Sequence, residues 1–109
     1  MEGNAPPVSF DRARFEQYIG LFDKGDPAVM AFWADDVVMH LGPHTIETPR
    51  GIYEHFTNLH DSMTESNRVL FFVSDDRWMA VKLRGEMTAV RDFEMLGTQV
   101  KRGMVQRIE

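Results

Sequence analysis

The stretch YIGLFDKGDPAVMAFWADDVVMHLGP, residues 18–43, decides the fold. Its Gly25 is expected to end one helix. Asp26 followed by Pro27 is expected to begin a second, because Asp is a preferred N-cap and Pro suits the first helical turn. An Ala-Asp-Asp turn then leads into the β-rich residues 37–41, which predict a strand. The order helix, helix, strand is typical of a domain that gathers its helices on one face of a sheet.

The first helix is predicted from an apolar face that begins upstream of this stretch. Four aromatic or apolar side chains follow one another at the i, i+3, i+4, i+7 spacing of one helical face: Phe15, Tyr18, Ile19 and Phe22. Ser9 or Asp11 is expected to cap this helix, and residues 1–8 are expected to form a flexible tail. The second helix, ending near residue 33, is short and mostly apolar, so we expect it to be largely buried.

A third helix is predicted downstream, after a short return strand at residues 45–48. The Pro-Arg-Gly sequence at residues 49–51 opens this helix, which is expected to run to about Glu65. Its apolar face has near-helical spacing and consists of Ile52, Phe56, Leu59 and Met63.

From residue 69 onward the apolar pattern acquires the period of a strand. Residues 69–73 are continuously apolar, which predicts a strand buried on both faces. In the next strand one face carries Met79, Val81, Leu83, Met87 and Ala89, and the other carries Trp78, Lys82, Arg84, Glu86 and Thr88. Residues 92–98 are expected to form a loop and residues 99–109 a last strand. The sequence therefore predicts an α+β fold, with three helices in the N-terminal half packed on an antiparallel sheet.

The chain resembles the nuclear transport factor 2-like superfamily, and within it the SnoaL-like group of polyketide cyclases and ketosteroid isomerase relatives. The resemblance covers about residues 9–109 and is carried by the opening stretch together with TPRGIYEHF (48–56), RVLFFVSDDRWMAVKLRGEMTA (68–89) and GTQVKRGMVQRIE (97–109). It implies one SnoaL-like domain with a cone-shaped fold, a strongly curved sheet and a conical pocket for a small apolar ligand. Relatives add one more strand, so the resemblance also implies that the final strand is missing.

The resemblance has consequences for the expected chemistry. Tyr18 stands where members similar to the ketosteroid isomerases have a tyrosine on the first helix. Leu41 and a residue near Gly103 stand where those members have an aspartate base and a late-strand acid. Steroid isomerisation by that mechanism is therefore not expected.

Tyr18 and His40 are candidate catalytic residues by their own chemistry. Tyr18 lies within the apolar face of the first helix, and a buried phenol needs a partner for its hydroxyl, either a substrate oxygen or a main-chain carbonyl. His40 ends the first strand and is a candidate general base, because the pKa of histidine lies near neutrality. Strand alternation would turn His40 away from the helices unless a bulge near Gly42 reverses it.

Arg84 and Glu86 are the second catalytic candidates. They lie two apart on one strand and so point to one face, and they are similar to the Arg-x-carboxylate pair of limonene-epoxide hydrolases, which orients acid and base around a water. They would face the pocket only if Gly85 marks a bulge, and would otherwise form a solvated or subunit-facing salt bridge. The residues expected to line the pocket are Trp33, Tyr53, Phe56 and His44.

Composition and charge argue against several classes of function. The 109 residues carry a net charge of −5 without a basic face, which disfavours a nucleic-acid partner. No apolar run is long enough to span a membrane and no secretory signal is visible, so a cytoplasmic location is expected. Cysteine is absent, the histidines lack metal-ligand spacing, and no nucleotide-binding motif occurs, so neither a metal nor a cofactor is expected.

Two functions stay open at this point. One is an enzyme of isomerase, cyclase or hydrolase type that uses acid–base chemistry on a small apolar carbonyl or ring compound. The alternative is a non-catalytic ligand-binding or assembly module with the same fold. We also expect a homodimer through the outer sheet face, because Trp78 is a large aromatic residue predicted to be exposed there.

Overall fold

The computed structural model describes residues 10–95 and 97–109; the expected tail and the Ser9 cap lie outside this part. Its helices are α1 (Arg12–Lys24), the short 3-10 helix η1 (Pro27–Phe32) and α2 (Pro49–His60). Its strands are β1 (Val38–Leu41), β2 (His44–Glu47), β3 (Met63–Ser74), β4 (Met79–Ala89), β5 (Phe93–Met95), β6 (Thr98–Val100) and β7 (Val105–Ile108).

Helix α1 forms as its apolar face predicts. The Asp11 carboxylate caps it by accepting a 2.8 Å hydrogen bond from the Arg14 backbone N–H. Gly25 ends it in the left-handed conformation, with φ 67°, which glycine adopts without steric cost. Phe15 and Ile19 are buried and form a core cluster with β3.

The second helix, η1, is less buried than predicted. Asp26 caps it as expected, accepting a 2.9 Å bond from the Ala28 backbone N–H. Val29 is buried, but Pro27, Ala28 and Ala31 are exposed, so the prediction of a largely buried helix is wrong. A six-residue 3-10 segment has no continuous apolar face, and only the side that packs on α1 and α2 is covered.

Helix α2 ends earlier than the predicted Glu65. Its last turn closes at His60 with Asp61 as C-cap, and β3 begins at Met63. Met63 is buried as expected, but it is buried from a strand. From this residue on, inward and outward side chains alternate with the period of a strand.

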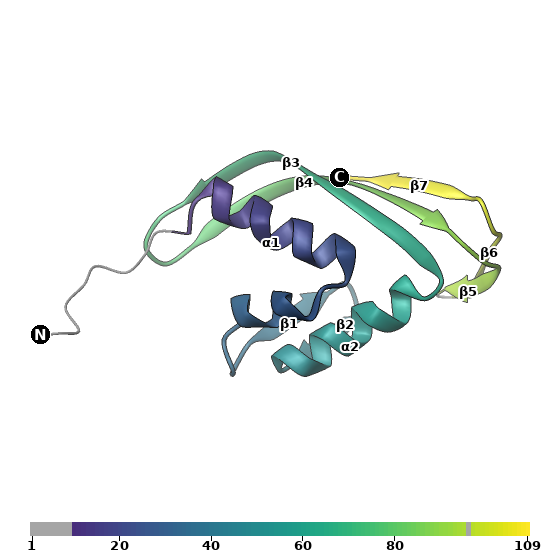
Figure 1. The fold of residues 1–109 in the computed structure, drawn as a ribbon, viewed down its shortest axis with the longest axis horizontal. Helices are drawn as coiled ribbons and strands as arrows, with labels where there is room; N and C mark the ends of the chain where they lie inside the picture. Colours follow the sequence, from purple (N-terminus) through teal and green to yellow (C-terminus); the bar gives the residue numbers. More distant parts are fainter. Residues whose placement is uncertain (1–9, 96) are drawn as a thin grey trace, which may run out of the picture.

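The main sheet is antiparallel and has the strand order β3-β4-β7; β1–β2 and β5–β6 form separate antiparallel hairpins. Figure 1 shows β3 and β4 arching over α1, with η1, α2 and the β1–β2 hairpin on the same, concave side. The predicted α+β class, with helices against a curved antiparallel sheet, is confirmed.

Two details of the predicted sheet are wrong. Phe71 and Val73 are 53% and 48% exposed, so residues 69–73 are not buried on both faces; a register shift between Val69 and Phe71 accompanies this change. The predicted loop at residues 92–98 contains strands of the β5–β6 hairpin, and the last strand is shortened by a turn at Gly103, whose φ is 90°.

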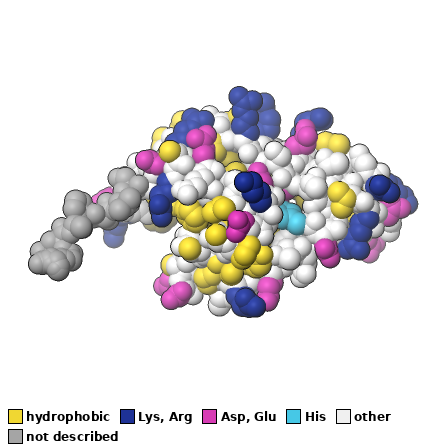
Figure 2. Space-filling model, viewed as in Figure 1, with side chains coloured by type: hydrophobic (Ala, Val, Ile, Leu, Met, Phe, Trp, Pro, Cys, Tyr) yellow, Lys and Arg dark blue, Asp and Glu magenta, His cyan; other side chains and the backbone are white. Residues whose placement is uncertain are grey.

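The outer surface carries interspersed charges of both signs (Figure 2). Hydrophobic side chains gather on the same view over α1 and η1. None of the helices in the part of the chain that the structure describes is long and apolar enough to cross a membrane.

Candidate functional site

A large open pocket of about 840 Å³ lies between the helices and the concave side of the sheet. Its inner wall is mostly aromatic and aliphatic: Phe10, Phe15, Tyr18, Ile19, Phe22, Phe32, Trp33, Met39, Leu41, Phe56, Val81 and Leu83. Its mouth is charged and is formed in part by the β3–β4 turn, with Asp75, Asp76, Arg77, Lys82 and Glu109. A pocket of this size and lining fits a small, mostly apolar molecule.

The predicted pocket residues divide into two groups. Trp33 and Phe56 line the central pocket. Tyr53 instead donates a 3.0 Å hydrogen bond to the carbonyl of Gly25, which ties α2 to the end of α1. His44 is exposed on β2, with its ring 6.0 Å from that of His55.

Tyr18 lies in the pocket wall, and its hydroxyl has a side-chain partner. The Trp33 indole N–H donates to the Tyr18 oxygen over 3.2 Å. Burial raises the pKa of Tyr18, and the Trp33 bond works in the opposite direction. Since that bond uses a lone pair of the oxygen, the hydroxyl hydrogen can still be donated to a bound molecule.

His40, Arg84 and Glu86 point away from the central pocket. His40 is exposed, with Nδ1 3.3 Å from the Thr45 hydroxyl, while its neighbours on β1 face the pocket. Arg84 pairs with Glu109 at the pocket mouth, Glu86 pairs with Arg107 of β7, and neither candidate is among the residues that line the pocket. The bulge lies in β3 and not at the glycine between them, so nothing turns them inward.

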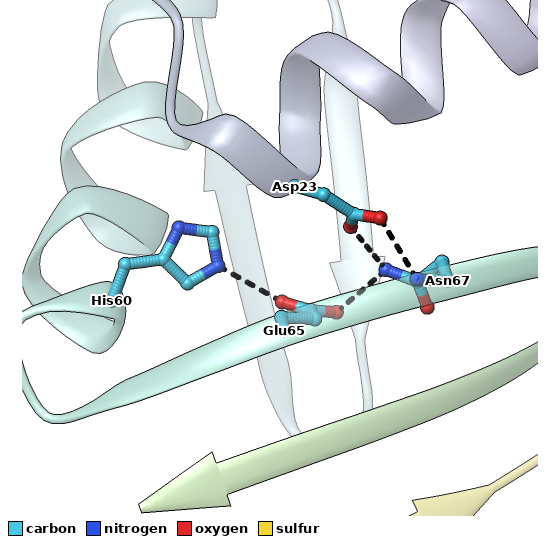
Figure 3. A network of polar contacts seen from close by, with 4 residues as sticks. All are labelled: Asp23, His60, Glu65 and Asn67. Atoms are coloured by element: carbon cyan, nitrogen blue, oxygen red, sulfur yellow. Dashed lines mark hydrogen bonds and ion pairs between the residues drawn. The ribbon is translucent and has the colours of Figure 1, made fainter. Parts of the chain in front are cut away.

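The polar group at the pocket wall was missed by sequence reasoning. Asp23, His60, Glu65 and Asn67, here called the wall network, come together where α1 and α2 end and β3 begins (Figure 3). Asn67 donates from its side-chain amide to Asp23 over 2.7 Å and to Glu65 over 3.0 Å. Its backbone N–H donates to the second Asp23 oxygen over 2.8 Å. The other Glu65 oxygen lies 3.0 Å from His60 Nε2.

The wall network is shielded from solvent. The side chains of His60 and Glu65 are 16% and 13% exposed. Burial raises the pKa of Asp23 and the nearby Glu65 charge raises it further, while the hydrogen bonds from Asn67 and the charge of His60 lower it. Glu65 is the carboxylate that lines the central pocket, and because both of its oxygens have a partner in the network it is positioned for proton transfer.

A period-two pattern could have found Glu65 and Asn67. Met63, Glu65, Asn67 and Val69 alternate with the polar residues at 64, 66 and 68, and they face inward. The predicted helix ran to about Glu65 and concealed the start of the alternation. Within residues 10–95 and 97–109, no three His, Asp or Glu side chains are grouped so as to hold a metal ion.

Comparison with known proteins identifies the fold. Neither a family model nor a curated protein matches the chain. Among solved structures, the chain is similar to a protein of Xanthomonas campestris pv. campestris described as a "putative polyketide cyclase", with a TM-score of 0.66 and 21% identity over 85% of this chain and 70% of the other. This likeness confirms the predicted fold, in which helices pack on the concave side of a curved antiparallel sheet.

Proposed function

We propose that this protein is an enzyme that moves a proton on a small, largely apolar carbonyl or ring compound held in the central pocket. The observation that carries the proposal is the position of Glu65, a shielded carboxylate next to Asn67 in an inner wall that is mostly aromatic and aliphatic. The solved structure that shares the fold is described as a cyclase for polyketides, which are compounds rich in carbonyl groups.

Glu65 is the proposed general base and acid. Asn67 donates a hydrogen bond to one of its oxygens and His60 Nε2 lies 3.0 Å from the other, and these two contacts fix the orientation of the carboxylate. Each oxygen has a second lone pair, so the carboxylate can still accept a proton from a bound compound. In an apolar site the charge on this group interacts more strongly with developing charge than it would in water.

Tyr18 is the proposed partner of the substrate oxygen. When a proton leaves the carbon next to a carbonyl, negative charge develops on the oxygen, and a positioned hydroxyl donor stabilises that charge. The hydroxyl of Tyr18 is held by Trp33, and its hydrogen is available for this bond. The aromatic wall supplies binding without reacting.

The proposal is tested with 3-cyclohexenone, a small cyclic ketone whose double bond moves into conjugation when one proton is removed and another returned. The conjugated product is followed by its ultraviolet absorbance. Glu65→Gln should lower turnover by about 10²-fold or more, the usual contribution of a positioned acid or base. Glu47→Gln is the matched control, because Glu47 is exposed on β2 outside the pocket, and it should keep the wild-type rate.

The opposite result would favour the non-catalytic alternative. A panel of cyclic ketones, epoxides and polyketide-like aromatics that bind to the wild-type protein without being converted would point to a ligand-binding module. Conversion that is unaffected by Glu65→Gln would show that another group carries the proton.

We also propose that the protein forms a homodimer through the outer face of the sheet. Phe71 and Val73 are large apolar side chains that are exposed on β3. Apolar side chains grouped on an exposed surface often mark a contact with another protein chain. Trp78, predicted on this face, instead lines the mouth of the central pocket and is 77% exposed. Light scattering should give twice the monomer mass, and Phe71→Lys should return the monomer.

A further inference from the structure

The wall network connects the central pocket with a separate hollow on the outside of the domain. Glu65 lines the central pocket. His60 lines the outer hollow, which measures about 340 Å³ and is formed by Asp23, Lys24, Gly25, Thr57, His60, Asp61, Met63 and Thr64. The 3.0 Å contact between the two side chains therefore spans the wall between the two spaces.

The two nitrogens of His60 face different partners. Nε2 contacts Glu65. Nδ1 lies on the side of Gly25, where a Cβ atom added at residue 25 would be 3.9 Å away at an ordinary van der Waals distance, and Gly25 also lines the outer hollow. Imidazole can accept a proton on one nitrogen and release a proton from the other. The ring is thus oriented to carry a proton across the wall.

The second branch of the network does not have this capacity. Asn67 joins Glu65 to Asp23, and Asp23 also lines the outer hollow. A carboxamide does not titrate, so the Asn67 branch holds the carboxylates in place without conducting a proton. His60 is the member of the network that can do so.

We propose that His60 is a relay residue that exchanges the proton of Glu65 with water in the outer hollow while a compound fills the central pocket; this rests on the proposed function of Glu65. In the outward direction Glu65 passes its proton to Nε2, and the hydrogen on Nδ1 leaves to water. In the inward direction water protonates Nδ1, and the Nε2 hydrogen passes to Glu65. One proton enters the ring and one leaves it in each passage.

Such a relay would be needed because a compound bound in the central pocket separates Glu65 from the water at the pocket mouth.

The ring of His60 is confined by two aromatic rings. Its centroid lies 5.9 Å from that of Phe22 and 6.5 Å from that of Phe56. The charged groups around it come from each neighbouring element: Glu65 from β3, Asp23 and Lys24 from α1, and Asp61 from the end of α2.

The experiment measures two quantities on 3-cyclohexenone in D₂O: the rate of isomerisation and the deuterium content of the product. Wild-type protein should place solvent deuterium in most product molecules. In His60→Gln, Glu65 should return the hydrogen that it removed, so the deuterium content per turnover should fall several-fold, more than the isomerisation rate does. A structural role is largely retained by Gln and would not change this ratio.

Two further variants keep the test decisive. His55→Gln is the same substitution on the same helix, and His55 packs beside Phe56 outside the wall network, so its deuterium content should equal that of the wild type. In His60→Ala, added imidazole should restore deuterium incorporation in proportion to its concentration. This rescue also decides the matter if the Gln variant folds poorly.

The outcomes separate the relay from the proposed function. The relay is overturned if the deuterium content of the product is unchanged in His60→Gln, or if imidazole does not raise it in His60→Ala. The proposed function still stands in that case, provided that Glu65→Gln loses activity. If wild type does not convert the probe, or Glu65→Gln converts it normally, the proposed function fails and the relay fails with it.

Discussion

Replacing Gly85 with alanine should disturb the wall network from the strand next to it. Gly85 lies directly opposite Asn67 in the β3–β4 pairing and lines the central pocket. A Cβ atom at this position would lie 2.9 Å from Asn67 Oδ1 and 3.4 Å from Ile108 Cγ1. Because real Cβ atoms do not approach an oxygen so closely, the Asn67 side chain has to move, and Ile108 restricts the movement of the new methyl group.

The expected magnitude follows from the bonds that Asn67 makes. Its amide donates to the carboxylates of Asp23 and Glu65, and a hydrogen bond to a charged group contributes about 1.5–3 kcal/mol. Losing one of them, offset by a gain of about 0.5–1 kcal/mol from replacing glycine within a strand, leaves Gly85→Ala about 0.5–2.5 kcal/mol less stable. For a domain of this size each kcal/mol corresponds to roughly 4–8 °C in Tm.

The matched control is Gly20→Ala. Gly20 lies inside α1 and an added Cβ atom would meet nothing within 4 Å, so this variant should gain about 0.5–1 kcal/mol. Urea unfolding followed by circular dichroism measures both free energies of unfolding. If Gly85→Ala is stabilised as Gly20→Ala is, Asn67 does not occupy the space in front of residue 85 and the account of the network is wrong.

Three further predictions concern single side chains. Tyr18→Phe removes the acceptor of the Trp33 indole N–H and the proposed donor to a ligand. The free energy of unfolding, measured with urea, and the free energy of binding 3-cyclohexenone, measured by calorimetry, should therefore each weaken by about 0.5–1.5 kcal/mol. Asp23 has its pKa raised above the ordinary 3.8 by burial, so its stabilising contribution is complete below that value and is lost as pH rises through the raised pKa. Relative to Asp23→Asn, the wild-type protein should therefore gain stability as pH falls from neutrality, and urea unfolding across this range measures the difference. Glu86→Gln breaks an exposed pair with Arg107 and should change stability by less than about 1 kcal/mol and leave turnover of 3-cyclohexenone unchanged.

The helical half of the fold could be predicted because its signals are local. The spacing of Phe15 and Ile19 marks the buried face of α1, and Asp11 and Gly25 mark its ends. Caps and apolar periodicity depend on residues a few positions apart, so the sequence contains the whole signal. Tyr18 belongs to the same helical face and lines the central pocket.

The end of α2 could not be predicted in the same way. The apolar spacing of Ile52 and Phe56 continues by coincidence to Met63, although the chain leaves the helix at His60. What ends the helix is the pairing of Met63 with Ala89, a contact across 26 residues that no local pattern contains. Glu65 was missed for this reason, because the prediction placed it at the end of a helix and its inward position on β3 together with Asn67 was not recognised.

The orientation of the other site candidates depended on one bulge. A bulge at Gly85 would have turned Arg84 and Glu86 toward the pocket, but the register shift lies in β3, between Val69 and Phe71. Gly85 instead provides room for Asn67 across the strand pair. A glycine in a strand indicates that something comes close to the backbone, and only the structure shows that the neighbour is an amide of the wall network.

The location of the wall network suggests how the pocket can vary without losing its chemistry. Glu65 and Asn67 lie at the beginning of β3, where α1 and α2 end, so three elements hold the proposed reactive group. The mouth is formed by the β3–β4 turn, where residues 73–80 are exposed and few contacts restrain the side chains. Substitutions at the mouth, Trp78 among them, can therefore change which compounds enter while the position of Glu65 is preserved. Substrate preference and proton transfer are then determined at opposite ends of the same strand.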